Sequence, residues 1–243
     1  MHINILTIFP EVFDALNYGV IGKAKTNKSF SIKLQDIRDY PVNKHGQIDS
    51  KPYGGGEGMV MMAEPLKKSL NNIPKEKLGK VIYLSPQGAL FNNTKAKKLS
   101  KEPSVTFICG RYEGIDQRFI DKYVDEEISI GDFIISGGEI AALCIVDSVI
   151  RHIPGVLGNK DSSKNDSFSN GLLKGPQYSR PEVFEEIPVP EVLLSGDHKK
   201  IKEWKDQKSI EATIIRRPDL LNNVKLTKKQ RKLLEDLASQ SIL

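Results

Sequence analysis

The sequence predicts an α/β protein in which helices flank a mostly parallel sheet, followed by a small helical domain. Short apolar runs typical of buried strands alternate with helical patterns along the first two thirds of the chain. This order is typical of parallel sheets covered by helices on both faces. Two of the runs break at a glycine, as strands do at the ligand-binding edge of such a sheet. The last third is polar and basic, with helical periodicity.

The chain has 243 residues, of which 39% are hydrophobic and 28% charged, as in ordinary globular proteins. This length suits one large domain, or a medium domain with a small one. The N-terminal run HINILTIF is too short for a signal peptide and has no cationic segment before it. The apolar segment 140–150 is interrupted by Asp147, which indicates a buried helix and not a membrane span. We therefore expect a cytoplasmic protein with no membrane partner.

Cysteine and histidine indicate neither a cross-link nor a metal site. Cys109 and Cys144 both lie in apolar runs, so we expect buried, reduced thiols. The four histidines are scattered without ligand-like spacing, and no structural metal site is expected.

Apolar patterning places the elements of the first domain. The predicted strands are continuous or alternating apolar runs, and they cover Ile3–Ile8, Ser29–Ile37, Lys80–Leu84, Val105–Cys109 and Ile128–Ile130. The predicted helices show start signals or an apolar period of 3.6 residues, and they cover 10–16, Ala63–Asn71, 94–100 with Asn93 as N-cap, and Gly137–Ile153. Apolar residues almost encircle the last of these, which predicts burial in the core or in a subunit interface.

Three glycine-containing turns follow strands that end at the same edge of the predicted sheet, at 85–88, 110–114 and 131–138. Glycines in such turns either reverse the chain or let backbone groups approach a ligand closely. Charged residues beside the turns favour a pocket, namely Arg111, Glu113, Asp116 and Asp132.

Two common phosphate-binding motifs are excluded. No GxGxxG opens the first strand–helix turn, so the main signal for a Rossmann site is missing. The segment 53–59, YGGGEGM, predicts a functional or mobile loop. It is not a P-loop, because no Lys-Ser/Thr follows it and no strand immediately precedes it.

Beyond the first domain the chain becomes polar. Segment 158–171 is rich in Ser, Asn and Asp, which predicts a linker. A helix is predicted from Asp197 to about Arg217 with Ser195 as N-cap, and Thr227 with Gln230 form a capping-box pattern. Residues 195–232 hold 12 Lys and Arg against 5 Asp and Glu, a net of +7. Such a segment is either a solvated helix face or a surface that binds a polyanion.

The motifs CGRYEGID, SIGDFIISGGE and RHIPGVLG closely resemble those of the bacterial tRNA (guanine-N1)-methyltransferases, a family of the SPOUT class. The resemblance runs through nearly the whole chain. It implies a deep trefoil knot towards the end of the sheet domain, a topology that physical reasoning alone would not suggest, because knots are very rare. The implied division is a knotted catalytic domain over 1–158, a linker over 159–171 and an all-α tRNA-binding domain over 172–243.

The resemblance assigns the binding of S-adenosylmethionine to the three turns. Phe133 and Ile135 stand where relatives often have Tyr and Leu, and both changes keep bulk and apolarity. The implied cofactor residues are Tyr83, Leu84, Ser85, Pro86, Gly110, Tyr112, Glu113, Ile130, Gly131, Asp132, Phe133, Ile134, Ile135, Gly137 and Gly138.

The implied reaction moves the methyl group of S-adenosylmethionine to N1 of guanine at tRNA position 37. Neutral guanine holds a proton on N1, so the reaction needs a base near N1 and a positive group near O6. By motif match the base is Asp166 and the group that stabilises O6 is Arg151. Without the resemblance, Asp166 is a solvated linker carboxylate and Arg151 a cation at a helix C-terminus.

The resemblance also implies partners. We expect a homodimer whose active sites are each built from two chains, because related SPOUT enzymes dimerise through their knot regions. Mg²⁺ is a further candidate cofactor, since relatives respond to it, although no carboxylates are spaced as an evident site. The RNA-binding candidates are basic residues of the linker and the C-terminal helices: Lys160, Lys164, Lys199, Lys200, Lys202, Arg216 and Arg217.

Two other functions fit parts of this pattern. A non-catalytic RNA-binding module on the same fold would keep the basic domain but would not need intact glycine turns, Arg151 and Asp166. A knotted methyltransferase acting on another RNA site would have a different basic domain and would not need an aspartate base in the linker.

Overall fold

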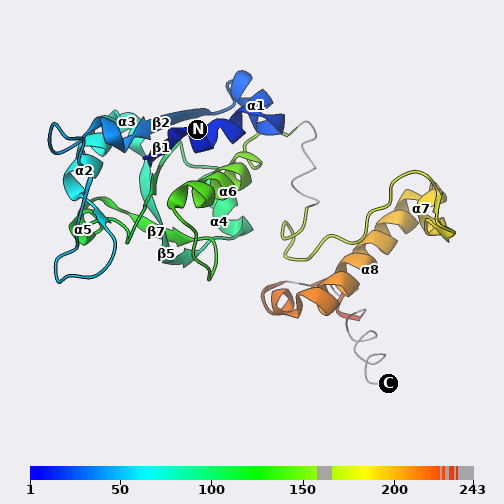
Figure 1. The fold of residues 1–243 in the computed structure, drawn as a ribbon. Helices are drawn as coiled ribbons and strands as arrows, with labels where there is room; N and C mark the ends of the chain where they lie inside the picture. Colours follow the sequence, from blue (N-terminus) through cyan, green and yellow to red (C-terminus); the bar gives the residue numbers. More distant parts are fainter. Residues whose placement is uncertain (158–165, 225, 228–229, 233, 235–243) are drawn as a thin grey trace. The chain divides into compact units, whose positions relative to one another are not determined.

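A computed structural model describes residues 1–157, 166–224, 226–227, 230–232 and 234 (Figure 1). The chain divides into two compact units, Met1–Lys160 and Asp161–Leu243. Each unit is described by itself below. In the described part of the chain, no helix has both the length and the apolarity that a membrane span requires.

The first unit is built on a five-stranded sheet in which every neighbouring pair is parallel. The order across the sheet is β2-β1-β6-β5-β7. The strands are β1 (His2–Thr7), β2 (Ser31–Asp36), β5 (Lys80–Leu90), β6 (Ser104–Cys109) and β7 (Glu126–Ser129). The prediction of a mostly parallel sheet flanked by helices is therefore confirmed.

Alternation along the strands supplies two apolar layers, one on each face of the sheet. In β1, Ile3 and Ile5 belong to one buried cluster and Leu6 to the other, as the two-residue period of a strand requires. The first cluster packs against η1 (Pro10–Asn17), α1 (Gly19–Thr26), α4 (Asn93–Leu99) and α6 (Gly138–Ile150). The second packs against η2 (Ile37–Asp39), α2 (Ala63–Asn71) and α5 (Gln117–Tyr123). Figure 1 shows α2 and α5 together at one side of the sheet, away from α4 and α6.

Three short elements complete the unit. A two-stranded antiparallel sheet joins β3 (Asp49–Ser50) to β4 (Val60–Met61), and α3 (Lys75–Leu78) precedes β5. The glycine-rich loop predicted at 53–59 connects the two small strands.

The structure corrects two sequence predictions around β5 and α4. The strand predicted to end at Leu84 resumes after an irregularity and pairs with β7 again at Ala89 and Leu90. The N-cap of α4 is Asn92, whose side chain accepts from the N–H of Lys95. Asn93, the predicted cap, contacts His152 instead, at 2.9 Å from its Nε2 atom.

Helix α6 carries the second cysteine and is partly exposed within its own unit. Cys109 is buried, but Cys144 is exposed, so the prediction for this second thiol is wrong. Ile140 is 50% exposed. The helix therefore buries one side against the sheet. Ile140 and Cys144, one turn apart, form an apolar strip that is exposed on the other side.

The second unit has a small core around α8 (His198–Arg216), in which Ile210, Thr213 and Leu172 are buried. The Oγ1 atom of Thr213 accepts from the N–H of Leu173 at 2.9 Å. The prediction of an all-α domain is wrong in one respect, because the unit also contains an antiparallel hairpin. Its other elements are β8 (Val183–Phe184), β9 (Ile187–Pro188), α7 (Glu191–Leu194) and η3 (Pro218–Asn223).

The helix caps of this unit were predicted with mixed success. Asp197 caps α8 by accepting from the N–H groups of Lys199 and Lys200. Ser195, the predicted cap, accepts from the N–H of Asp197 instead. The capping box is confirmed: the Thr227 N–H donates to Gln230 Oε1 at 2.9 Å, and the Gln230 N–H donates to Thr227 Oγ1 at 3.3 Å.

Glu126 generates a prediction about stability. Its carboxylate in β7 accepts from Lys80 of β5 at 2.5 Å and from Lys95 of α4. Burial opposes this charge, but the two lysines outweigh it and hold the pKa of Glu126 below its ordinary value. A lowered pKa stabilises the fold above the unfolded pKa, and this contribution disappears as the pH falls through the folded pKa.

Glu126→Gln should therefore lower the free energy of unfolding by about 1 kcal/mol at pH 7. The difference from wild type should begin to shrink below about pH 4.3, where the unfolded chain takes up a proton, and should disappear as the pH falls through the lower pKa of the folded carboxyl. Urea unfolding at several pH values measures this difference. Equal stability of the two proteins at pH 7 would contradict the assignment.

Candidate functional site

A pocket of about 450 Å³ opens at the carboxyl edge of the parallel sheet. Its walls are an irregular stretch inside β5 and the segments that follow β6 and β7, and these three strands are neighbours in the sheet. Ligands of open α/β sheets bind outside the carboxyl ends of the strands, and this volume suits a small molecule. The prediction that the three glycine turns line one edge is confirmed.

The first wall is the irregular stretch inside β5. The Oγ atom of Ser85 accepts from the N–H of Gln87 at 3.1 Å and so forms a tight local turn. A Cβ at Gly88 would lie 2.3 Å from the backbone nitrogen of Ile128. Only glycine lets the turn lie this close to β7, and the strand pairing resumes directly afterwards.

The second wall follows β6 and rests on Tyr83. A Cβ at Gly110 would lie 2.7 Å from the Tyr83 ring. Burial, and then the Glu127 carboxylate, raise the pKa of Tyr83 to about 12, so its hydroxyl is neutral at physiological pH. Tyr112 follows with a φ of +61°, which turns the chain sharply out of the strand.

The third wall leads from β7 into α6 and lies against the second. The N–H of Gly138 donates to the carbonyl of Gly110 at 2.9 Å, and Arg111 forms an antiparallel bridge with Gly137. A Cβ at Gly138 would lie 2.8 Å from the Cα of Cys109. Glycine at the start of α6 therefore brings the two walls into backbone contact.

A buried ionic network fastens these walls to β1. The Glu139 carboxylate is 1% exposed. It accepts from Thr7 Oγ1 at 2.9 Å and from Arg111 Nε at 3.1 Å. Arg111 also donates from Nη1 to the carbonyl of Ser136 at 3.0 Å, which fixes the end of the third wall. One arginine thus links the second wall to the third, and one carboxylate links both to the sheet.

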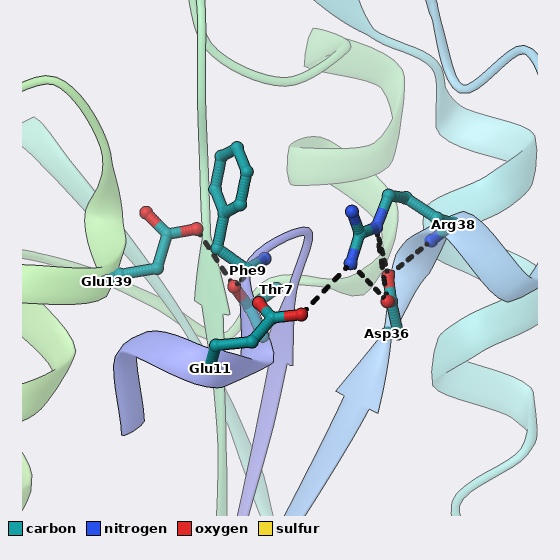
Figure 2. A network of polar contacts seen from close by, with 6 residues as sticks. All are labelled: Thr7, Phe9, Glu11, Asp36, Arg38 and Glu139. Atoms are coloured by element: carbon teal, nitrogen blue, oxygen red, sulfur yellow. Dashed lines mark hydrogen bonds and ion pairs between the residues drawn. The ribbon is translucent and has the colours of Figure 1, made fainter. Parts of the chain in front are cut away.

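Figure 2 shows the contacts of Glu139, Thr7 and Phe9 in this network and, beside them, a second set of polar contacts at the end of β2. The N–H of Phe9 donates to Thr7 Oγ1 at 2.9 Å. The Arg111 guanidinium lies 4.5 Å from the centroid of the Phe9 ring, within cation–π range. Further out, Arg38 binds Asp36 at 2.8 Å and approaches Glu11 at 3.7 Å.

Cys109, at the end of β6, is buried and unreactive. Burial, and then the Glu139 carboxylate, raise the pKa of this thiol well above its ordinary value. The thiol therefore stays protonated and is not a nucleophile.

The glycine-rich loop borders the second wall. The N–H of Glu113 donates to the carbonyl of Met59 at 2.9 Å, and a Cβ at Gly58 would lie 2.6 Å from the Glu113 carboxylate. Tyr53 at the far end of the loop is 99% exposed. The sequence indicated a functional loop here but not its neighbour in space.

The predicted cofactor residues converge on this pocket with one exception. Asp132 is exposed and does not line it. The lining includes Tyr83, Leu84, Ser85, Pro86, Gly110, Tyr112, Glu113, Ile130, Gly131, Phe133, Ile134, Ile135, Gly137 and Gly138.

Some residues of the site were not singled out from the sequence. Gln117, Glu127, Ser129 and Ser136 also line the pocket. Their place in the sequence could have indicated Glu127 and Ser129, because both lie in β7, the strand that leads into the third turn. Glu139 does not line the pocket, and its sequence position alone suggests only a carboxylate at a helix N-terminus.

The two predicted catalytic residues lie in different units. Arg151 is the exposed C-cap of α6 in the first unit. Asp166 belongs to the second unit, where its side chain is 40% exposed and Oδ1 lies 4.0 Å from Lys174 Nζ.

The predicted RNA-binding cations lie at opposite ends of α8. Lys199, Lys200 and Lys202 are exposed in its first turns, and Arg216 and Arg217 are exposed at its end. A helix of 19 residues is about 28 Å long, so these are two separate groups. Lys160 and Lys164 lie outside the described residues. No group of three metal-binding side chains occurs within the described ranges.

Comparison with known proteins assigns a family to this architecture. A family profile described as tRNA (Guanine-1)-methyltransferase TrmD matches residues 1–223. A protein of Clostridium novyi (strain NT) named tRNA (guanine-N(1)-)-methyltransferase is 51% identical over 235 residues, 97% of each chain. A protein of the same name from Clostridium botulinum (strain Loch Maree / Type A3) is 49% identical over 236 residues, 97% of this chain and 98% of its own. That of Clostridium perfringens (strain SM101 / Type A) is 48% identical over 235 residues, 97% and 99% of the two chains.

The network behind the pocket predicts a specific loss of stability. Thr7→Val keeps the side-chain shape but removes the donor to Glu139 and the acceptor for Phe9 N–H. Glu139 is then left short of a hydrogen bond in a buried place and the Phe9 N–H in a partly buried one, so the free energy of unfolding should fall by about 1–3 kcal/mol. Thr26→Val is the control, because Thr26 is exposed and donates only to the carbonyl of Gly22 within α1. Urea unfolding should show a larger loss of free energy of unfolding for Thr7→Val than for Thr26→Val. Equal losses in the two variants would mean that the network does not stabilise the fold.

Proposed function

Because this chain belongs to the tRNA (guanine-1)-methyltransferase family, we propose that its pocket at the sheet edge holds the methyl donor. The activity of this family is methyl transfer from S-adenosylmethionine to N1 of guanine in tRNA. The observation that carries this proposal is the backbone cradle of the three walls. A Cβ at Gly110 or Gly138 would meet protein atoms within 2.8 Å, so the walls can approach one another and a ligand only where side chains are missing.

The lining chemistry supports this ligand. Apolar side chains such as Leu84, Ile130 and Ile135 alternate with backbone polar groups and with Glu113 and Glu127. Such a mixture suits a molecule with a flat apolar ring system and a positively charged centre. When bound, S-adenosylmethionine supplies an electrophilic methyl group, and every other role falls to side chains of the protein.

We propose Asp166 as the general base that takes the N1 proton of guanine. A solvent-exposed carboxylate is a weak base in water. The efficiency of Asp166 as a general base would therefore come from being held close to the guanine in a site that excludes water. In the second unit, Lys174 Nζ lies 4.0 Å from Asp166 Oδ1.

Arg151 would stabilise the charge that develops on O6. Removal of the N1 proton delocalises negative charge onto this oxygen, and a guanidinium offers two parallel donors to it. Arg151 is the exposed C-cap of α6.

Further assignments rest on the family and on specific contacts. The Gly138–Gly110 hydrogen bond and the Arg111–Gly137 bridge hold the third wall against the second, which supports a trefoil knot at this place. Guanine 37 as target, a cytoplasmic location and tRNA binding by the basic ends of α8 are proposed from the resemblance. Since the described residues contain no metal-binding cluster, no step is assigned to Mg²⁺.

We further propose a homodimer with shared active sites. The apolar strip of α6 includes Ile140, and in the third wall Phe133 is 55% and Ile134 82% exposed. Apolar side chains exposed together on one unit favour a protein interface. A twofold pair would let one chain supply Asp166 and the other supply the pocket and Arg151.

The role of Asp166 is tested with Asp166→Asn, which keeps the shape of the side chain and removes its basicity. Methyl transfer should fall by about 10²–10⁴-fold, while the affinity for S-adenosylmethionine stays within twofold. Asp206→Asn, an exposed position on α8, is the matched control and should keep full activity. Nucleoside analysis for 1-methylguanosine gives the readout. Activity of Asp166→Asn within threefold of wild type would remove Asp166 from the mechanism.

The shared site is tested by complementation. A chain with Asp166→Ala is mixed with a chain with Gly137→Val, each inactive alone. If the base and the pocket of one site come from different chains, mixed dimers have one intact site, and activity should recover to at most half of the wild-type value per dimer. Mass spectrometry checks that subunits have exchanged. Exchange without recovery would contradict the shared site.

A further inference from the structure

A second concave surface lies between α2 and α5, outside the methyl-donor pocket. This α2–α5 depression has a volume of about 600 Å³. Its lining residues are Ala63, Glu64, Lys67, Lys68, Asn71, Arg118, Phe119, Lys122 and Tyr123.

The depression is strongly basic. Four lining residues are cations and one is a carboxylate, which gives a net charge of 4 − 1 = +3. Glu64 pairs with Lys68 at 2.8 Å, and Arg118 is bound by Asp116 at 2.6 Å. Within the described ranges no carboxylate pairs with Lys67 or Lys122. These two ammonium groups therefore carry the uncompensated charge.

The floor of the depression is apolar, which strengthens the electric field of the lysine charges. Phe119 is fully buried, and its ring centroid lies 5.1 Å from that of Tyr123. Lys122 Nζ lies 5.7 Å from the Tyr123 ring, which holds the ammonium at the wall. A cleft with one sign of charge and low-dielectric walls concentrates its field towards an oppositely charged ligand.

The depression and the methyl-donor pocket share helix α5. Gln117 and Ile120 line the pocket, whereas Arg118, Phe119 and Lys122 line the depression. The two sites are thus separated by about the width of one helix, 10–12 Å. The two sites are therefore close enough for a single RNA strand to reach both.

We propose that the α2–α5 depression binds the phosphodiester backbone of the tRNA substrate, through Lys67 and Lys122. This inference rests on tRNA being the substrate and adds a contact surface on the sheet unit to the one proposed on α8. An open basic surface beside the reaction site fits an extended polyanion, whose phosphates release counterions when they meet lysines. Such contacts orient the RNA without reading its sequence.

The test compares two double variants that remove the same charge. Lys67→Ala/Lys122→Ala empties the depression of its unpaired cations. Lys75→Ala/Lys77→Ala removes two equally exposed lysines of α3 that do not line it. The dissociation constant for unmodified tRNA is measured against KCl concentration for both variants and for wild type.

For Lys67→Ala/Lys122→Ala, the slope of log K against log salt should fall by about 1.4–1.8, since each lost phosphate contact removes about 0.7–0.9. Near physiological salt the tRNA should bind roughly tenfold more weakly. The KM for tRNA should rise by the same factor with kcat within twofold, as expected for binding that is equal in ground and transition states. The α3 control should match wild type.

Titration with S-adenosylmethionine checks that the pocket is intact, and wild-type methylation of the same tRNA checks the proposed function separately. Lys67→Glu/Lys122→Glu should weaken tRNA binding further than the alanine pair. Equal slopes for the α2–α5 variant and the α3 control, with normal donor binding in both, would overturn the proposal.

Discussion

The buried carboxylate of Glu139 organises the edge of the sheet at which the pocket opens. An ionised side chain with 1% exposure costs several kcal/mol unless donors replace its water. Here the donors come from Thr7 in β1 and Arg111 after β6, while Glu139 itself lies in the first turn of α6, where the helix dipole favours negative charge. Three segments that are far apart in the sequence must therefore meet for the charge to be tolerated.

This requirement explains the glycines around the network and the shape of the pocket. The Arg111–Glu139 pair occupies the space beside Gly137, where a Cβ would lie 2.3 Å from Arg111 Nε. Gly138 lets α6 begin against the backbone of β6. The walls are held before any ligand arrives, which lowers the ordering that binding must impose. The proposed catalytic groups differ in kind, because Arg151 and Asp166 are exposed and lie in separate units.

Local patterning predicted much of the fold because burial is periodic. Helix α2 was predicted with its observed bounds, and each strand of the large sheet within a few residues, except that β5 continues to Leu90. The continuation is not predicted because a glycine such as Gly88 is typical of a chain reversal. In the structure its missing side chain lets β5 lie close to β7. Cys144 was placed inside because α6 is apolar all round, although only one side faces its own sheet. The pocket residues followed from the resemblance, whereas the partners of Glu139 depend on tertiary contacts that no local pattern encodes.

The most direct test of this account is calorimetric titration of S-adenosylmethionine into Glu139→Gln. The substitution keeps the size of a side chain that does not line the pocket, but it removes the charge that holds Arg111 and the second and third walls. Loss of one charge-assisted hydrogen bond, about 1.5–3 kcal/mol, should weaken binding of the methyl donor by roughly tenfold or more, with the variant still folded by thermal unfolding. Unchanged affinity in the folded variant would show that the pocket does not depend on the buried carboxylate.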